Sequence, residues 1–237
     1  MIKDEVMPSG KWEFDDNVTS VFDDMLQRSI PAYENMRDLC FRVGRNFVKP
    51  DGLIIDIGCS NGLAFAQFVR EFGGKVNYWM YDVSGPMLKE CYERYETLVD
   101  KGRAKVEKKD ICEGLGIYNE ADLVLSILTL QFTPIEYRQK IASSIYEALK
   151  PDSALVIVEK VLGSDYYIDS MLVEEYYKIK AENAYTQEQI AAKRKSLEGV
   201  LVPITAAWNE DMLKKAGFKK VDCFWRYLNF AGWVAIK

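Results

Sequence analysis

Short apolar runs alternate with amphipathic stretches between residues 53 and 158, and no other feature restricts the possible folds of this sequence as much. The runs have the length and β-branched content of buried strands, and they cover residues 53–57, 76–81, 104–107, 121–127 and 154–158. Helical patterns at 63–72, 86–100 and 134–149 separate most of them. Strands that alternate with helices form βαβ units, which build a parallel sheet with its ligands at the carboxyl ends of the strands.

The flanking segments complete an α/β domain. Residues 14–48 carry a helical pattern broken at Ile30-Pro31 and predict N-terminal cover helices, whereas residues 161–204 lack a strand pattern and predict a helical insert. After a last helix at 211–216, residues 218–227 and 232–236 predict a hairpin, one strand of which must run antiparallel to the rest. We therefore predict a single domain over residues 1–237 with a mostly parallel seven-stranded sheet.

A sequence of 237 residues without histidine excludes several kinds of active site at once. A Ser-His-Asp triad and a Cys-His pair are both impossible, and a metal site would lack its commonest nitrogen ligand. The five cysteines share no CxxC spacing, so we predict reduced thiols and no metal site. Proton transfer has to use a carboxylate, Lys, Tyr, Cys or the substrate itself.

The charge balance indicates the kind of partner. The chain has 31 basic and 36 acidic residues and no block of Lys or Arg, which disfavours binding to phosphate backbones. We expect a small-molecule substrate and no direct binding of nucleic acid. The N-terminus lacks the apolar core of a signal peptide, and no stretch approaches the ~18 apolar residues of a membrane span, so we expect a cytoplasmic protein.

A glycine-rich segment, Asp56 to Gly62, follows the first strand and precedes a helix. Backbone N–H groups and a helix N-terminus at such a turn favour a polar or negatively charged ligand group. Ser60 stands where a dinucleotide-binding loop has its second glycine, so the site need not hold a pyrophosphate. S-adenosyl-methionine, which carries a carboxylate and a ribose, is compatible; the alternative is a tight turn that serves packing alone.

Acidic residues end the next two strands. Asp82 lies 20 residues after Gly62, the spacing at which a carboxylate reaches ribose hydroxyls, although it could instead cap the following helix. Asp110 follows the third strand and precedes Ile111, a pair that could bond an adenine amino group and cover the ring. A turn-forming aspartate is the alternative there.

The glycine-rich segment and the two strand-end aspartates, in this order along the chain, resemble the pattern of the class I S-adenosyl-methionine-dependent methyltransferases. The resemblance implies a Rossmann-like fold. Further segments narrow the resemblance to the carboxy-S-adenosyl-methionine synthases, from about Trp12 to the C-terminus. They are residues 22–33, Asp56 to Ser60, Thr129 to Phe132, Glu159-Lys160, Tyr185, Lys193 to Glu198 and Asn229-Phe230.

The resemblance implies an activity and a set of site residues. Members of that family move the carboxyl group of prephenate onto the methyl carbon of S-adenosyl-methionine and release phenylpyruvate, and a separate enzyme uses the product on the wobble uridine of tRNA. Arg194 would hold the added carboxylate as the catalytic residue, across a homodimer. The residues that would contact S-adenosyl-methionine or its carboxylated form are Tyr33, Gly58, Cys59, Ser60, Asp82, Val83, Asp110 and Ile111.

Arg194 also has a physical argument of its own. A guanidinium aimed at the methyl group of a cationic sulfonium is repelled by ~1–4 kcal/mol at ~4 Å unless an anion lies between them. A carboxylate on the methyl carbon would make the interaction with the guanidinium attractive. The alternative is an exposed helical arginine paired with Glu198. The Tyr-rich insert is a candidate subunit contact or a lid on its own subunit.

Two positions depart from the family pattern. Ile127, on the fourth strand, stands where many members carry Asn, and strand alternation places Ser126 on the opposite face. Val83 replaces the Asn that follows the second-strand aspartate. Both changes fall in the predicted pocket, so an ordinary methyltransferase acting on a small molecule is the alternative, followed by a catalytically silent binding module.

Overall fold

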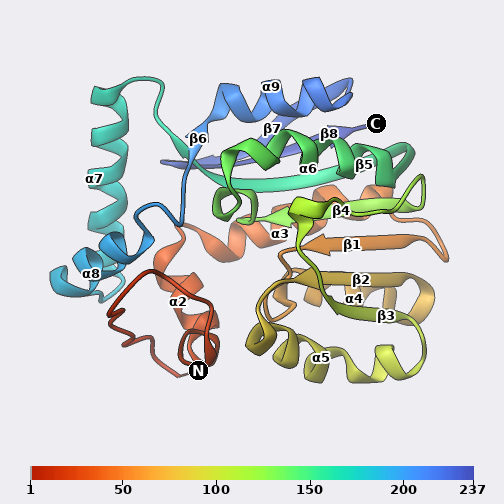
Figure 1. Cartoon of the computed structure of the whole chain (residues 1–237), viewed down its shortest axis with the longest axis horizontal. Coiled ribbons are helices and arrows are strands. Elements are labelled where there is room, and N and C mark those ends of the chain that lie inside the picture. The colour runs from red at the N-terminus through yellow and green to blue at the C-terminus, as the bar shows by residue number, and fades with distance from the viewer. Residues whose placement is uncertain (1) are drawn as a thin grey trace.

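The computed structural model describes residues 2–237, in which helices cover both faces of a central β-sheet (Figure 1). Seven strands follow one another in the order β3-β2-β1-β4-β5-β8-β7, and an eighth, β6, pairs with the end of β5. The strands are β1 (Leu53–Ile57), β2 (Asn77–Asp82), β3 (Ala104–Lys108), β4 (Ala121–Ile127), β5 (Leu149–Leu162), β6 (Ile204–Thr205), β7 (Lys220–Tyr227) and β8 (Phe230–Ile236).

The strand directions confirm the predicted sheet. The ladders joining β3, β2, β1, β4 and β5 are parallel, whereas β8 is antiparallel to both β5 and β7. The chain order reverses between β1 and β4, which are adjacent although β2 and β3 lie between them in sequence. Such a switch point leaves a crevice at the carboxyl ends of the strands, where α/β proteins bind their ligands.

Alternation along the buried strands supplies both halves of the core. On β1, Ile55 and Ile57 pack among residues of α6 and α9, whereas Ile54 packs among residues of α3, α4 and α5. Successive side chains of a strand point to opposite faces, so an almost continuous apolar run indicates a strand that is covered on both sides. The helices are α1 (Asp16–Ser20), α2 (Phe22–Ser29), α3 (Tyr33–Gly44), α4 (Ala66–Phe72), α5 (Gly85–Asp100), α6 (Ile135–Ala148), α7 (Tyr166–Glu182), α8 (Gln187–Leu197) and α9 (Ala206–Ala216).

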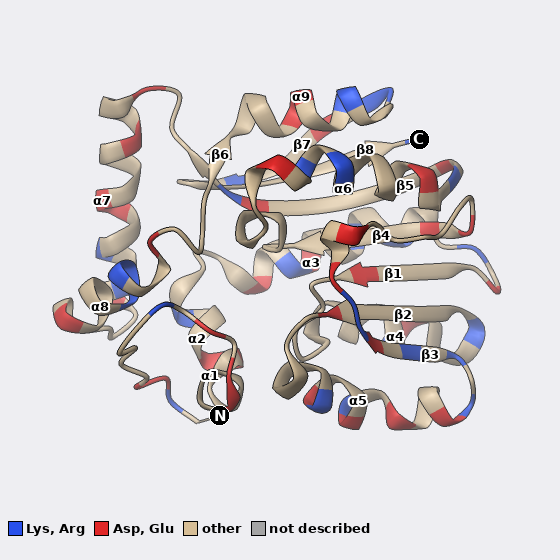
Figure 2. Ribbon diagram, viewed as in Figure 1, with Lys and Arg blue, Asp and Glu red and all other residues tan. Residues whose placement is uncertain are grey.

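The N-terminal segment and the insert lie together beside the carboxyl ends of the strands (Figure 1). Arg28 of α2 donates to the backbone oxygens of Asn183 and Ala184, each at 2.8 Å, and Trp12 N donates to Ser196 O at 2.9 Å. Figure 2 shows Lys and Arg of α7 and α8 gathered where these helices approach each other. Two segments about 150 residues apart in sequence thus close one end of the sheet.

Several predicted boundaries were wrong. The strand predicted at 154–158 runs from Leu149 to Leu162, because Leu149 pairs with Ala121 on β4 and Lys160 pairs with Phe230 on β8. The insert therefore begins after residue 162, and its predicted end at 204 falls in β6. The helix predicted at 211–216 begins at residue 206, where the Thr205 side chain accepts a hydrogen bond from Trp208 N. Pairing with neighbouring strands and a helix N-cap set these boundaries, and neither can be read from the pattern of apolar residues.

Candidate functional site

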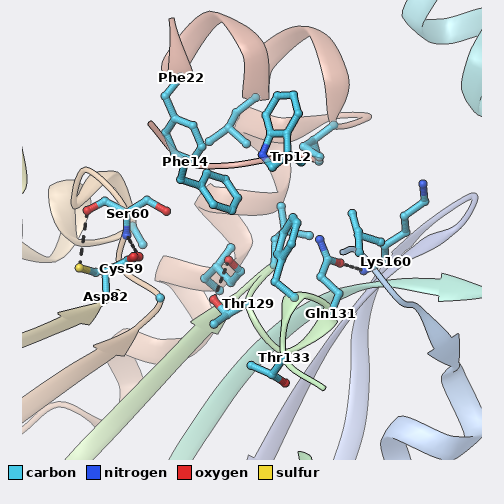
Figure 3. Close-up of a pocket in the computed structure, with 18 of the residues that line it drawn as sticks. Trp12, Phe14, Phe22, Cys59, Ser60, Asp82, Thr129, Gln131, Thr133 and Lys160 are labelled. Carbon is cyan, nitrogen blue, oxygen red and sulfur yellow. Dashed lines mark hydrogen bonds between the residues drawn. The ribbon is translucent and has the colours of Figure 1, made fainter. Parts of the chain in front are cut away.

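A pocket of about 410 Å³ lies at the carboxyl ends of β1, β2 and β4, where the strand order reverses. Its size is within the range of small-molecule sites. Aromatic side chains of the N-terminal segment, among them Trp12, Phe14 and Phe22, form one wall (Figure 3). All eight residues expected to contact the cofactor line this pocket: Tyr33, Gly58, Cys59, Ser60, Asp82, Val83, Asp110 and Ile111.

The glycine-rich loop is held mainly by hydrogen bonds from its backbone N–H groups to acceptors on β2. Gly58 N and Cys59 N both donate to Tyr81 O, at 2.7 and 3.0 Å. Ser60 N donates to Asp82 Oδ2 at 2.8 Å, and Gly62 N donates to Cys59 O at 2.8 Å. Neighbouring acceptors of β2 and of the loop itself thus engage these four N–H groups, and the predicted contact between the loop and a ligand stays a prediction.

Asp82 joins the loop to the start of α5. Its Oδ2 accepts from Ser60 N and its Oδ1 accepts from Ser84 N at 2.9 Å, while the Ser84 side chain, and not Asp82, caps α5. Burial raises the pKa of Asp82 above its usual value. Each carboxylate oxygen accepts more than one hydrogen bond, so Asp82 keeps acceptor capacity for a ligand in the pocket.

The other predicted contacts surround the same pocket. Tyr33, the first residue of α3, and Ile111 are both buried, whereas Val83 lies at the rim with 55% of its surface exposed. Asp110 accepts from Cys112 N at 2.9 Å, as expected for a turn-forming aspartate. Among residues 2–237, its second carboxylate oxygen accepts no hydrogen bond from the backbone, so the turn and a ligand contact are compatible.

Asp56 contributes a buried carboxylate that the spacing argument did not use. It lines the pocket, and its Oδ2 has no hydrogen-bond partner among residues 2–237. Burial, reinforced by the nearby Asp82, raises its pKa well above the usual value. A buried acceptor without a partner is costly, and the ammonium group of a bound amino acid would satisfy it. The residues present therefore fit S-adenosyl-methionine.

The segment after β4 crosses the centre of the pocket (Figure 3). Glu159 accepts backbone hydrogen bonds from Thr129, Leu130 and Gln131, at 3.2, 2.9 and 2.7 Å, and this fixes the segment onto β5. Burial raises the pKa of Glu159 to about 7. In the sequence, Thr129 to Phe132 and Glu159 are noticeable only because they resemble segments of a family. The structure shows that Glu159 holds residues 129–131 in place.

Ile127, the residue on the fourth strand that departs from the family pattern, lies on the face that strand alternation predicted. Ile127 lines the pocket, whereas Ser126 is fully buried on the other face and is not among the lining residues. The pocket therefore presents an aliphatic side chain at this position.

Arg194 lies outside the pocket that the other eight residues share. It is exposed on α8 and lines a separate, more open depression with Tyr177 and Glu198. Within the part of the chain that is described, its guanidinium has no ion pair with Glu198. Sequence reasoning did not assign a role to four lysines that line the main pocket: Lys109, Lys160, Lys180 and Lys193. Lys160 and Lys193 fall inside the family-like segments, whereas no local pattern distinguishes Lys180.

Residues 2–237 contain no group of three or more Cys, Asp or Glu side chains arranged to hold a metal ion. Over the same residues, no helix combines the length and the apolar character that a membrane span requires.

Comparisons with solved structures show the fold. An O-methyltransferase family protein from Burkholderia thailandensis superposes with a TM-score of 0.66 and 16% identity, over 94% of this chain and 60% of that chain. Phosphoethanolamine N-methyltransferase 2 from Haemonchus contortus, in complex with S-adenosyl-L-methionine, superposes with a TM-score of 0.62 and 18% identity, over 86% of this chain and 52% of its own. The fold is that of the class I methyltransferases, as predicted.

Sequence comparisons narrow the assignment. A family model described as "Methyltransferase domain" matches residues 54–152. Carboxy-S-adenosyl-L-methionine synthase from Methylococcus capsulatus is 37% identical over 94% of this chain and 93% of its own length. The synthase of the same name from Wolinella succinogenes is 35% identical over 96% of this chain and 94% of its own length. The chain belongs to the carboxy-S-adenosyl-L-methionine synthase family.

Proposed function

We propose that this chain transfers the ring carboxyl group of prephenate to the methyl carbon of S-adenosyl-methionine, forming carboxy-S-adenosyl-methionine and phenylpyruvate. The ring of prephenate becomes aromatic as it loses carbon dioxide and hydroxide, and the hydroxide takes up the proton that the methyl carbon gives up. No histidine is needed, which suits a chain that has none. The observation that carries the proposal is that the eight family-matched residues line one pocket.

The contacts support a division of the pocket. Asp82 binds the ribose hydroxyls, and Asp110 and Ile111 hold the adenine, since all three lie at strand ends around the same cavity. Asp56 accepts from the ammonium group of the methionine part, because its buried Oδ2 has no partner among residues 2–237. Tyr33 and the glycine-rich loop enclose the remainder.

A homodimer is part of the proposal, because Arg194 does not reach the pocket of its own chain. Helix α7 exposes large side chains to solvent: Tyr166 is 89% exposed, Tyr167 is 78% exposed and Met171 is 47% exposed. Exposed apolar surface of this kind marks interaction sites. A second copy seated there would bury α7 and bring Arg194 toward the neighbouring pocket. The insert packs on its own N-terminal segment through Arg28, so it serves as a lid as well.

We further propose that the chain works as a single cytoplasmic domain on small molecules. Its net charge of −5 supports a role apart from nucleic acid, with a separate enzyme using the product on the wobble uridine of tRNA.

The ligand that copurifies with the protein tests the proposal. After denaturation, mass spectrometry should find a nucleoside heavier than S-adenosyl-methionine by one carbon dioxide, and incubation with prephenate should yield phenylpyruvate. Arg194→Ala should lose the heavier ligand, whereas Lys195→Ala, also exposed on α8, should retain it. Retention in Arg194→Ala would reject the assigned role.

An ordinary methyltransferase is the second candidate, because Ile127 presents an aliphatic side chain to the pocket. That candidate predicts unmodified S-adenosyl-methionine as the bound ligand and no phenylpyruvate.

A further inference from the structure

Of the lysines that line the pocket, Lys109, Lys160 and Lys180 have no carboxylate partner among residues 2–237. The Lys109 ammonium group donates to Leu115 O at 2.6 Å, which leaves Lys160 and Lys180 to be explained. Lys160 lies on β5 and Lys180 on α7, and their ammonium nitrogens approach the same aromatic ring, 4.7 and 5.6 Å from the centroid of Tyr176. The Lys180 nitrogen also lies 5.1 Å from the centroid of the Tyr185 ring. Lys180 is buried, with a relative exposure of 6%. These aromatic faces stabilise cations only in part.

Two of the neighbouring carboxylates are already engaged by other cations, and a third, Asp169, accepts from Gly163 N at 2.7 Å. Asp4 forms the buried ion pair with Lys193, and Asp24 pairs with Arg28 at 3.1 Å. Within the described part of the chain, no carboxylate oxygen lies within 4.0 Å of the Lys160 or Lys180 nitrogen. The charged groups felt by Lys180 are Lys193, Lys160, Asp4 and Arg28, and those felt by Lys160 are Asp169 and Arg194. Positive charge is therefore in excess on this wall.

This excess of positive charge is unfavourable unless an anion binds beside the lysines. Burial lowers the pKa of Lys160 to about 8, and burial together with Lys193 and Lys160 lowers that of Lys180 to about 7. A buried ammonium without a counter-charge destabilises the protein, and a carboxylate ligand would restore its normal titration.

The lysine wall lies away from the nucleoside contacts. In Figure 3, Cys59, Ser60 and Asp82 lie at one side of the pocket and Lys160 at the other, with Thr129 and Gln131 between them. The Gln131 Oε1 accepts from Lys160 N at 2.6 Å, which anchors the segment after β4 beside this lysine. A ligand on the lysines would thus face the nucleoside across the middle of the pocket.

We propose that Lys160 and Lys180 form an anion subsite for the second substrate. The subsite binds the side-chain carboxylate of that substrate, which is not the carboxyl group that is transferred. This inference rests on the proposed function, in which prephenate is a dicarboxylate. An ion pair to the transferred carboxyl group would be lost as that group leaves as carbon dioxide, so it would stabilise the substrate more than the transition state. The other carboxylate keeps its charge from substrate through to phenylpyruvate, and a fixed pair of cations can hold it throughout.

The test replaces each lysine with methionine, which keeps most of the length of the side chain and removes the charge. Lys160→Met and Lys180→Met should raise the KM for prephenate by about tenfold or more, the effect of losing one charged hydrogen bond. Inhibition by phenylpyruvate should weaken in parallel, because the product keeps the bound carboxylate. The Kd for S-adenosyl-methionine, measured by calorimetry, should stay within about twofold and shows that each variant is folded.

Lys178→Met is the matched control, because Lys178 lies on the same helix with 63% of its side chain exposed. It should leave the KM unchanged. An unchanged KM in both pocket variants would overturn the proposal, and so would a raised KM with unchanged phenylpyruvate inhibition, which would assign the lysines to the transferred carboxyl group.

Direct binding separates this inference from the proposed function. If the wild-type protein forms no phenylpyruvate, the proposed activity fails. Calorimetric titration of phenylpyruvate into the complex with S-adenosyl-homocysteine then still tests the subsite. Binding that is lost in Lys180→Met and kept in Lys178→Met supports the subsite, whereas absence of binding to the wild-type protein overturns it.

Discussion

Substitution of Gly58 by alanine probes the turn on which the pocket is built. Gly58 has a φ of +67°, and a Cβ at this position would lie 2.3 Å from Thr129 Cγ2 and 2.4 Å from Thr129 Oγ1. Thr129 cannot turn away freely, because its Oγ1 donates to Ile57 O at 3.0 Å. The variant must therefore strain the loop, displace the segment after β4, or break this hydrogen bond.

Three effects contribute to the expected loss. A non-glycine residue in the left-handed region costs about 1–2 kcal/mol. Overpacking adds about 1–3 kcal/mol, and loss of the Thr129 hydrogen bond adds about 0.5–1.5 kcal/mol. If all three effects add, we expect Gly58→Ala to lower the free energy of unfolding by roughly 2.5–6.5 kcal/mol. That is a large part of the stability of an ordinary domain.

Urea unfolding at 25 °C measures this loss of stability. Two further variants separate the cost of the left-handed backbone from the cost of the contact with Thr129. Gly102 has the same φ of +67°, but a Cβ added there would meet no heavy atom within 4 Å, so Gly102→Ala should lose only about 1–2 kcal/mol. Thr129→Ala in the Gly58→Ala background removes both close atoms and should recover part of the difference. Equal losses in Gly58→Ala and Gly102→Ala would refute the steric argument.

Three other perturbations address single groups. Asp82→Asn should weaken S-adenosyl-methionine binding by about tenfold or more in calorimetry, since an amide nitrogen replaces one oxygen that accepts hydrogen bonds. Glu159→Gln should lower the free energy of unfolding by about 1–3 kcal/mol in urea, because three backbone N–H groups share its carboxylate. The pKa of Lys180 is lowered from 10.5 to about 7, so the unfolded chain binds more protons between these values and stability should rise with pH across them. Thermal unfolding at several pH values measures this rise, and Lys180→Met should reduce it.

The sequence by itself determined the sheet and, to within one residue, the carboxyl ends of β1 to β4, although it did not determine the bounds of β5. Apolar runs such as 53–57 and 121–127 identify strands covered on both faces, because side-chain burial follows a local period. Asp82 and Asp110 were placed at the pocket for a second reason: parallel strands bring their carboxyl ends to one edge of the sheet.

Only the tertiary structure decided how the polar groups are used. Tyr81 O accepts hydrogen bonds from the N–H groups of Gly58 and Cys59, two residues that were expected from the sequence to lie at the cofactor. Lys193 finds its counter-charge in Asp4, 189 residues away, and this leaves Lys180 without one among residues 2–237. Hydrogen bonding and charge pairing depend on which distant segments meet. Local periodicity therefore predicts the framework, whereas the electrostatics of the pocket arise only when the N-terminal segment and the insert close over it.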